Sequence, residues 1–170
     1  MLLIHDLDDE NKIKIEGLIP EGSKIYSKDI DNIHPCLGCF KCWLKTPGRC
    51  IINDSYTESP KYIKQADKMI IITEVRYGSY SPYVKRVIER SIGFLLPFFR
   101  KYHGEIHHSI RYDHVPELIF IGYSSTITSE EEKTFKDLVK ANALNFGAEK
   151  FNSFLVKDTT EIIEIIKNIL

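Results

Sequence analysis

The sequence predicts an α/β fold, a doubly wound five-stranded parallel sheet with helices on both faces. Short β-branched or apolar runs alternate along the chain with longer amphipathic or charged stretches. Two of the strand-like runs are almost continuously apolar, which is typical of parallel strands buried on both faces. The 170 residues suffice for one domain with a sizeable core, so we expect a single domain over 1–170.

The predicted elements follow one another in a regular order. The strands are "LLIHDL" (2–7), "KIYSK" (24–28), "KMIIIT" (68–73), "ELIFIG" (117–122) and "KFNSFLV" (150–156). Helix-like stretches cover 9–18, 56–66, 82–96, 129–146 and 159–170. The fourth helix is marked by Ser129 and Glu132 at capping-box spacing and by Gly147 at its end. A flavodoxin-like sheet fits this order, and ligands bind such sheets at the carboxyl ends of the strands. Function is therefore expected in loops 6–12, 74–81 and 123–128.

Composition excludes some classes of partner. Hydrophobic residues make up 43% and charged residues 28%, and the formal net charge of -1 provides no field for nucleic acid or an anionic membrane. The opening "MLLIHDLDDE" lacks the basic and long apolar regions of a signal peptide, and no apolar run is long enough to span a bilayer. We expect a cytoplasmic protein.

All cysteines of the chain lie in "HPCLGCFKCWLKTPGRC", at Cys36, Cys39, Cys42 and Cys50. In a reducing compartment, clustered thiols more often serve as metal ligands or redox groups than as disulfides. Two-residue gaps let consecutive thiolates converge, and the "TPGR" turn can return the fourth. An iron-sulfur cluster, a zinc ion and simply packed or redox-sensitive thiols all agree with this spacing. Trp43 either shields such a cofactor or packs against the protein.

The segment "PCLGCFKCWLKTPGRCIINDS" and the following "ADKMIIITEVRYGSYSPYVKRVIER" resemble the flavodoxin-like NADPH-dependent FMN reductase and iron-sulfur flavoprotein family. The likeness is strong over residues 34 to 90, and the rest agrees in strand-helix order. In the family, a Thr-Pro-Val-Tyr-Trp-Gly-Ser loop lies along the flavin ring, before a Lys-x-x-Ile-Asp-Arg helix. The matching positions here are Thr73, Val75, Gly78, Ser79, Ser81, Lys85, Ile88 and Arg90. Glu74 and Arg76 replace a proline and an aromatic residue of the family, which makes the ring environment more charged.

The resemblance implies an enzyme in which NAD(P)H reduces bound FMN and electrons pass to a quinone, a disulfide, an iron-sulfur partner or another acceptor. It also implies a possible [4Fe-4S] cluster on the four cysteines and a homodimer. Amides near Gly78 and Ser79 would face the ring, and Tyr77 and Tyr80 would stack on or border it. The predicted cofactor-binding residues are Thr73, Arg76, Tyr77, Gly78, Ser79, Tyr80, Ser81, Gly122, Tyr123 and Ser124.

The first loop departs from that family. Its carboxylates are Asp6, Asp8, Asp9 and Glu10, with no glycine among them, where the family has a Gly-Ser-Pro-Arg stretch and Gly-Asn-Thr for the FMN phosphate. A phosphate site needs free amides, hydroxyls and positive potential. The acidic loop therefore predicts weak FMN binding. The alternative function is a flavodoxin-like protein that has lost FMN and serves as a metal-binding or interaction module.

Two further segments carry expectations. The histidines of "HGEIHHSIRYDH" (103–114) either bind a transition metal, form a lid or provide loop polarity. The segment "SIGFLLPFFRKY" (91–102) has more apolar side chains than one covering helix buries. We expect the homodimer to form through this segment.

Overall fold

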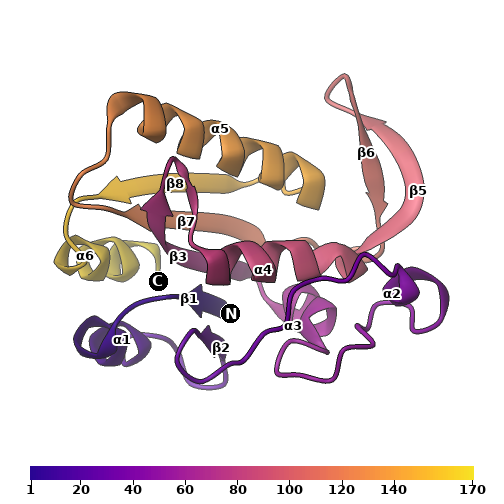
Figure 1. Cartoon of the computed structure of the whole chain (residues 1–170), viewed down its shortest axis with the longest axis horizontal. Helices are drawn as coiled ribbons and strands as arrows, with labels where there is room; N and C mark the ends of the chain where they lie inside the picture. The colour runs from indigo at the N-terminus through magenta and orange to yellow at the C-terminus, as the bar shows by residue number, and fades with distance from the viewer.

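A parallel sheet with the strand order β2-β1-β3-β7-β8 lies at the centre of the computed structural model (Figure 1). The structure describes residues 1–170 apart from the side chain of Asp9. The sheet strands are β1 (Leu2–His5), β2 (Lys24–Ser27), β3 (Lys68–Arg76), β7 (Glu117–Tyr123) and β8 (Phe151–Val156), and β4 (Ser79–Tyr80) pairs antiparallel with β3. These are the five predicted strands, in the flavodoxin-like order. The predicted fold class is confirmed.

Helices cover both faces of the sheet because alternate strand residues point to opposite sides. On one face, Ile4 and Ile71 pack in a core with helices α3, α4 and α5; on the other, Leu3 and Ile70 pack with α1 and α6. The helices are α1 (Asp9–Glu16), α2 (Lys41–Leu44), α3 (Ser59–Gln65), α4 (Pro82–Arg90), α5 (Ser129–Phe146) and α6 (Thr160–Ile169), with a 3-10 turn, η1, over Ser91–Phe94. Among the described residues, no helix combines the length and apolar character needed to cross a membrane.

The register of the sheet brings three strand ends together. His5 pairs with Ile72, so Asp6, the next residue, follows β1 beside Thr73 and Glu74 of β3. Glu74 in turn pairs with Tyr123 at the end of β7. Residues far apart in the sequence therefore meet at one carboxyl edge, where the strand pattern predicts the site.

A β-hairpin replaces the predicted end of the third strand-helix unit. The helix expected over 82–96 ends at Arg90, and β5 (Leu95–Tyr102) pairs antiparallel with β6 (Glu105–Ile110). His103 and Gly104 both have positive φ, at 48° and 84°, as a two-residue hairpin turn of the right twist requires. Pro97 also removes a helical hydrogen bond from this run. The hairpin stands beside one end of α5 (Figure 1), where His107 contacts Asn145.

Helix α5 confirms the predicted range but begins on a different cap. Thr128 accepts a hydrogen bond from the Glu131 amide at 3.2 Å, and the Glu131 carboxylate accepts one from the Thr128 amide at 2.9 Å. The predicted capping pair of Ser129 and Glu132 is thus wrong by one residue, because Thr128 offers the same hydroxyl one position earlier. The helix ends at Gly147, whose φ of 69° is left-handed, as predicted.

Candidate functional site

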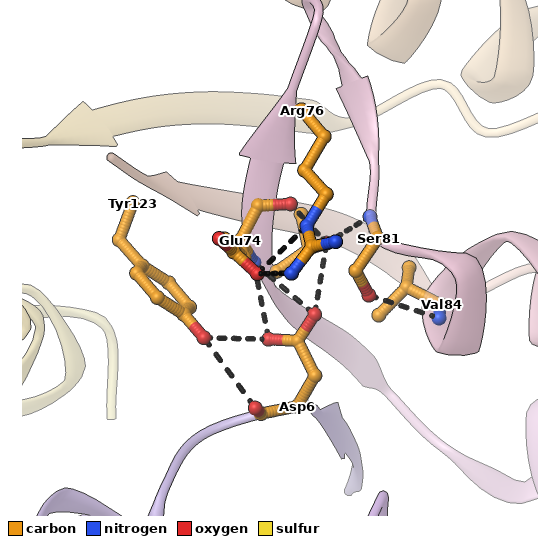
Figure 2. Close-up of polar contacts among 7 residues, drawn as sticks. Asp6, Glu74, Arg76, Ser81, Val84 and Tyr123 are labelled. Atoms are coloured by element: carbon orange, nitrogen blue, oxygen red, sulfur yellow. Dashed lines mark hydrogen bonds and ion pairs between the residues drawn. The ribbon is translucent and has the colours of Figure 1, made fainter. Parts of the chain in front are cut away.

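Asp6 is the centre of a polar cluster at the carboxyl edge of the sheet (Figure 2). Its carboxylate accepts hydrogen bonds from the Glu74 amide at 3.0 and 3.1 Å and from the Tyr123 hydroxyl at 3.0 Å. The Thr73 hydroxyl donates a longer one of 3.3 Å. Thr73 also accepts from the Ser81 amide at 2.9 Å, and the Ser81 hydroxyl caps α4 through the Val84 amide. Groups from β1, β3, β7 and α4 are therefore joined through one carboxylate.

This carboxylate is buried without a cation. The Asp6 residue is 5% exposed, and no ion pair reaches it from any Lys or Arg in the described part of the chain. Arg76, the nearby cation in Figure 2, instead pairs with Glu74 at 2.7 Å. Burial raises the pKa of Asp6 although its hydrogen-bond donors favour the charged form. Burial also raises the pKa of Tyr123, and the negative charge of Asp6 adds to the effect.

The residues at this edge do not fit an FMN phosphate in the family's position. The cavity beside Asp6 has a volume of about 450 Å³ and is lined in part by Glu74, Arg76, Ser81 and Arg86. At the first loop, the donors that an anion needs already serve the Asp6 carboxylate. A phosphate brought there would meet like charge and find no free amide or hydroxyl among those of Glu74, Thr73 and Tyr123. Of the predicted acidic residues, the carboxylate of Asp9 is outside the described part, Asp8 and Glu10 are exposed, and Asp6 is buried at this edge.

Several predicted ring-side residues face helix α5 or solvent instead of this cavity. Tyr77 is 92% exposed at the tip of the β3–β4 turn, beside Gly78. Tyr80 is buried, its ring stacked on Phe120 at 5.4 Å. Gly122 is enclosed, because a Cβ there would lie 2.9 Å or less from three side chains. Ser79 belongs to β4, and Ser124 lines a second cavity of about 390 Å³ together with Glu74 and Tyr123.

Replacing Gly78 with alanine should destabilise the protein through contact with α5. Gly78 has a φ of 73°, and a Cβ there would lie 2.7 Å from Thr134 Cβ and 2.9 Å from the Glu131 carbonyl oxygen. We expect a loss of about 2 kcal/mol or more in the free energy of unfolding, measured in urea with and without added flavin. Gly22→Ala is the control, because Gly22 has a φ of 81° with nothing within 4 Å. Equal losses in the two variants would refute the packing explanation.

The stability of the protein should carry a pH dependence from Asp6. Since the folded pKa of Asp6 is raised, the folded state binds its proton more tightly, and this stabilisation, present below the unfolded pKa of about 3.9, is lost as pH rises through the folded value. Asp6→Asn should therefore gain stability relative to the wild type between about pH 4 and pH 7, measured by urea unfolding. Asp137→Asn should show the opposite slope, because the Lys133 ion pair lowers the pKa of Asp137. Parallel curves for Asp6→Asn and the wild type would contradict the assignment.

The four cysteines line one small cavity of about 140 Å³. All four are free; Cys42 is buried and Cys39 is exposed. Burial raises the pKa of Cys42, and the nearby thiols of Cys50, Cys36 and Cys39 raise it further. The indole nitrogen of Trp43 donates to the Ile92 carbonyl at 3.0 Å, and its ring stacks on Phe40 at 4.9 Å. Trp43 therefore packs the outer part of this segment against the turn that follows α4.

A buried ion pair between Arg90 and Asp54 holds together the two ends of the cysteine segment, at His34 and Asp54. Arg90, the last residue of α4, binds both oxygens of Asp54, at 2.7 and 3.0 Å. Its Nη1 also donates to the His34 carbonyl at 2.8 Å, while Asp54 accepts from the His34 amide at 3.0 Å. Although burial opposes ionisation, Arg90 and the amides of His34 and Tyr56 lower the pKa of Asp54. Asp54 is not among the predicted site residues, although its partner Arg90 belongs to the family-like helix motif.

The cysteine cavity differs in its suitability for a single metal ion and for a cluster. Among the described side chains, no group of three or more His, Cys, Asp and Glu residues could hold a metal ion. The predicted histidines are dispersed: His107 contacts Asn145, His108 stacks on Phe99, and His114 contacts the Ala66 carbonyl. A single ion needs its ligands within about 2.3 Å, whereas the thiolates of an iron-sulfur cluster surround a larger body. Four thiols on one cavity fit the donor chemistry of a cluster.

Comparison with known proteins gives a partial sequence match and a match of the whole fold. No protein-family model matches the chain. An iron-sulfur flavoprotein of Methanocaldococcus jannaschii is 36% identical over 90 residues, which are 51% of this chain and 44% of that protein. The match thus spans less than half of the length of the iron-sulfur flavoprotein.

Solved structures share the whole fold at low sequence identity. An NAD(P)H:quinone oxidoreductase from Methanothermobacter marburgensis superposes with a TM-score of 0.60 at 12% identity, over 98% of this chain and 95% of that one. The Trp repressor binding protein from Bacillus subtilis gives 0.59 at 11% identity, over 99% and 98%. At such identities the likeness concerns the fold. Together with the 90-residue match to an iron-sulfur flavoprotein, it agrees with the predicted resemblance and shows that the chain has a flavodoxin-like fold.

Proposed function

We propose that the chain is a flavin-dependent NAD(P)H oxidoreductase whose cysteine cavity holds a [4Fe-4S] cluster. The observation that carries this proposal is the convergence of four thiols on one cavity in a flavodoxin-like fold. The relative that shares 36% identity is named an iron-sulfur flavoprotein, which supports both redox groups. The electron acceptor is a quinone, a disulfide, an iron-sulfur partner or another small molecule or protein.

The flavin is proposed to be held by its ring system rather than by its phosphate. When bound, a flavin supplies hydride acceptance and electron transfer, which the side chains present here do not provide. Arg76, Ser81 and Arg86 line the cavity of about 450 Å³ beside Asp6 and offer donors to the carbonyl edge of a flat ring. The Asp6 carboxylate and Glu74 oppose a phosphate at the same edge. Riboflavin and FMN should therefore bind with similar, weak affinity.

Protein purified without oxygen provides the test. We expect a visible spectrum with a broad iron-sulfur absorption, iron and sulfide in near-equal amounts, and quenching of flavin fluorescence on addition of riboflavin or FMN. NADH or NADPH should then bleach the bound flavin. Colourless protein that leaves flavin fluorescence unquenched at high protein concentration would refute the oxidoreductase proposal.

A second candidate function is a protein without flavin that serves as a metal-binding or interaction module. The observation that favours it is that the Asp6 carboxylate accepts the hydrogen bonds of the Glu74 amide and the Tyr123 hydroxyl, so neither donor is available to a flavin phosphate. Protein that contains iron and sulfide but binds neither riboflavin nor FMN would select this function over the oxidoreductase.

We further propose that the chain forms a homodimer. Most of the predicted interface segment, 91–102, belongs to strand β5, so the contact would be made by the β5–β6 hairpin. Phe98, Phe99 and Ile106 are 68%, 69% and 68% exposed on its two strands. Apolar side chains exposed in this number on one hairpin commonly mark an interface. Sedimentation should show a dimer at micromolar concentration and a monomer for Phe98→Ser/Phe99→Ser. A wild-type monomer under these conditions would contradict the proposal.

A further inference from the structure

Arg90 is the one charged residue among those that line the cysteine cavity. It is 3% exposed, and it ends helix α4 immediately before the turn η1. Because a guanidinium stays charged, burying it at this depth is costly unless anions or hydrogen-bond acceptors surround it. The hydrogen-bond partners of Arg90 therefore indicate what kind of group the cavity can bind.

The known partners of Arg90 account for only part of its guanidinium. Nη1 and Nη2 donate to Asp54, and Nη1 donates also to the His34 carbonyl. Nε is buried and has no hydrogen-bond partner among the described residues. Burial opposes the charge, but Asp54 and the neighbouring Cys50 outweigh it and raise the pKa of Arg90. The Nε–H of a fully buried cation thus remains unpaired beside the thiols.

We infer that Arg90 sets the reduction potential of the group bound in the cysteine cavity, by donating its Nε hydrogen to a sulfur and by placing its charge beside it. This inference rests on the proposed cluster. A cluster held by four thiolates is anionic and becomes more so by one charge when it takes up an electron. A nearby cation and a hydrogen bond to sulfur both stabilise the reduced form more than the oxidised form.

Asp54 makes the inference testable because its charge is opposite and it does not line the cavity. Arg90→Gln removes the cation, Asp54→Asn removes the anion that pairs with it, and the double variant removes both. If Arg90 acts through its charge and its N–H, the potential should fall in Arg90→Gln and rise in Asp54→Asn. It should also fall below the wild type in the double variant, because the arginine is the nearer group. If the Arg90–Asp54 pair only stabilises the loop, both single variants should lose bound iron, and their reduction potentials should not shift in opposite directions.

The experiment is anaerobic reconstitution of each full-length variant with iron and sulfide, followed by redox titration of the EPR signal of the reduced cluster. We expect Arg90→Gln to weaken the preference for the reduced form about tenfold, which for a one-electron couple is about 59 mV. Iron and sulfide content, with the circular dichroism spectrum, reports whether each variant is loaded and folded.

The outcomes separate the two proposals. A wild-type protein that takes up no iron and sulfide overturns the cluster and, with it, the role of Arg90. A loaded wild type whose potential equals that of the loaded double variant overturns the role of Arg90 alone. If Arg90→Gln and the double variant do not load, Asp54→Asn still decides, since an unchanged or lower potential there overturns the inference.

Discussion

Cys39→Ser should yield protein without iron and sulfide but with an intact sheet. Cys39 lines the cysteine cavity from an exposed position and belongs to neither of the two core clusters. Serine removes one of four soft thiolate ligands at almost constant volume, so the loss falls on the bound group rather than on the fold. Iron and sulfide analysis after anaerobic reconstitution should show the loss, and the free energy of unfolding of the metal-free protein should change by less than about 0.5 kcal/mol.

Leu37→Ser is the matched control, because Leu37 is 71% exposed and lines the same cavity with a side chain that cannot ligate iron. It introduces the same residue into the same loop and should leave the iron and sulfide content close to that of the wild type. Equal losses in Leu37→Ser and Cys39→Ser would mean that the loop, rather than the thiol, limits binding. Full loading of Cys39→Ser would remove Cys39 from the ligand set.

The central sheet was predictable because each strand can be recognised from the apolar pattern of its own residues. Runs such as "KMIIIT" and "ELIFIG" are almost continuously apolar, and the strands that contain them, β3 and β7, are paired and largely buried in the sheet. Helix α5 was equally accessible, since its apolar spacing and the stop at Gly147 lie within one segment. In these elements, local pattern and tertiary packing favour the same structure.

The β5–β6 hairpin was missed because its apolar run is ambiguous. "FLLPFF" continues the helical pattern of α4 in composition, and only Pro97 and the His103–Gly104 turn argue for strands. Both strands expose apolar side chains, so the alternation that normally marks a half-buried strand is weak here. A turn that depends on a positive φ at His103 could not be read from composition.

The candidate site was predictable in place but not in its contacts. The segments predicted as loops 6–12 and 74–81 do meet at the carboxyl edge, through Asp6 and Glu74, although α1 begins at Asp9 and β3 and β4 occupy much of the second segment. Nothing in "HDLDDEN" distinguishes Asp6, which is buried, from Asp8, which is exposed. The difference arises because the Glu74 amide and the Tyr123 hydroxyl come from strands 68 and 117 residues away in the sequence. Long-range donors of this kind leave no local sequence pattern.

Asp6→Ser should make the protein prefer FMN over riboflavin. In the wild type, a phosphate at this edge is opposed by the Asp6 charge and finds the Glu74 amide and the Tyr123 hydroxyl already engaged. Serine removes the charge and releases both donors, and a hydrogen bond to a charged group contributes about 1.5–3 kcal/mol. We expect FMN affinity relative to riboflavin to rise tenfold to a hundredfold in fluorescence titrations. Wild-type affinity for FMN should rise with salt, because salt screens the repulsion between the phosphate and Asp6. The affinity of Asp6→Ser for FMN should fall with salt, because there salt screens the attraction between the phosphate and its donors.

Asp8→Ser separates released donors from lost charge. Asp8 is exposed in the same loop and its side chain makes no capping hydrogen bond to α1, so its replacement removes one carboxylate and frees none of the donors held by Asp6. An exposed charge at several ångströms is worth on the order of 1 kcal/mol or less after screening, so the ratio of FMN to riboflavin affinity should change by less than about fivefold. Equal gains in the two variants would show that net charge alone controls FMN binding. A wild-type protein that already prefers FMN strongly, with affinity falling as salt is added, would mean that cations lining the same cavity, such as Lys28 or Arg86, bind the phosphate and outweigh the Asp6 charge.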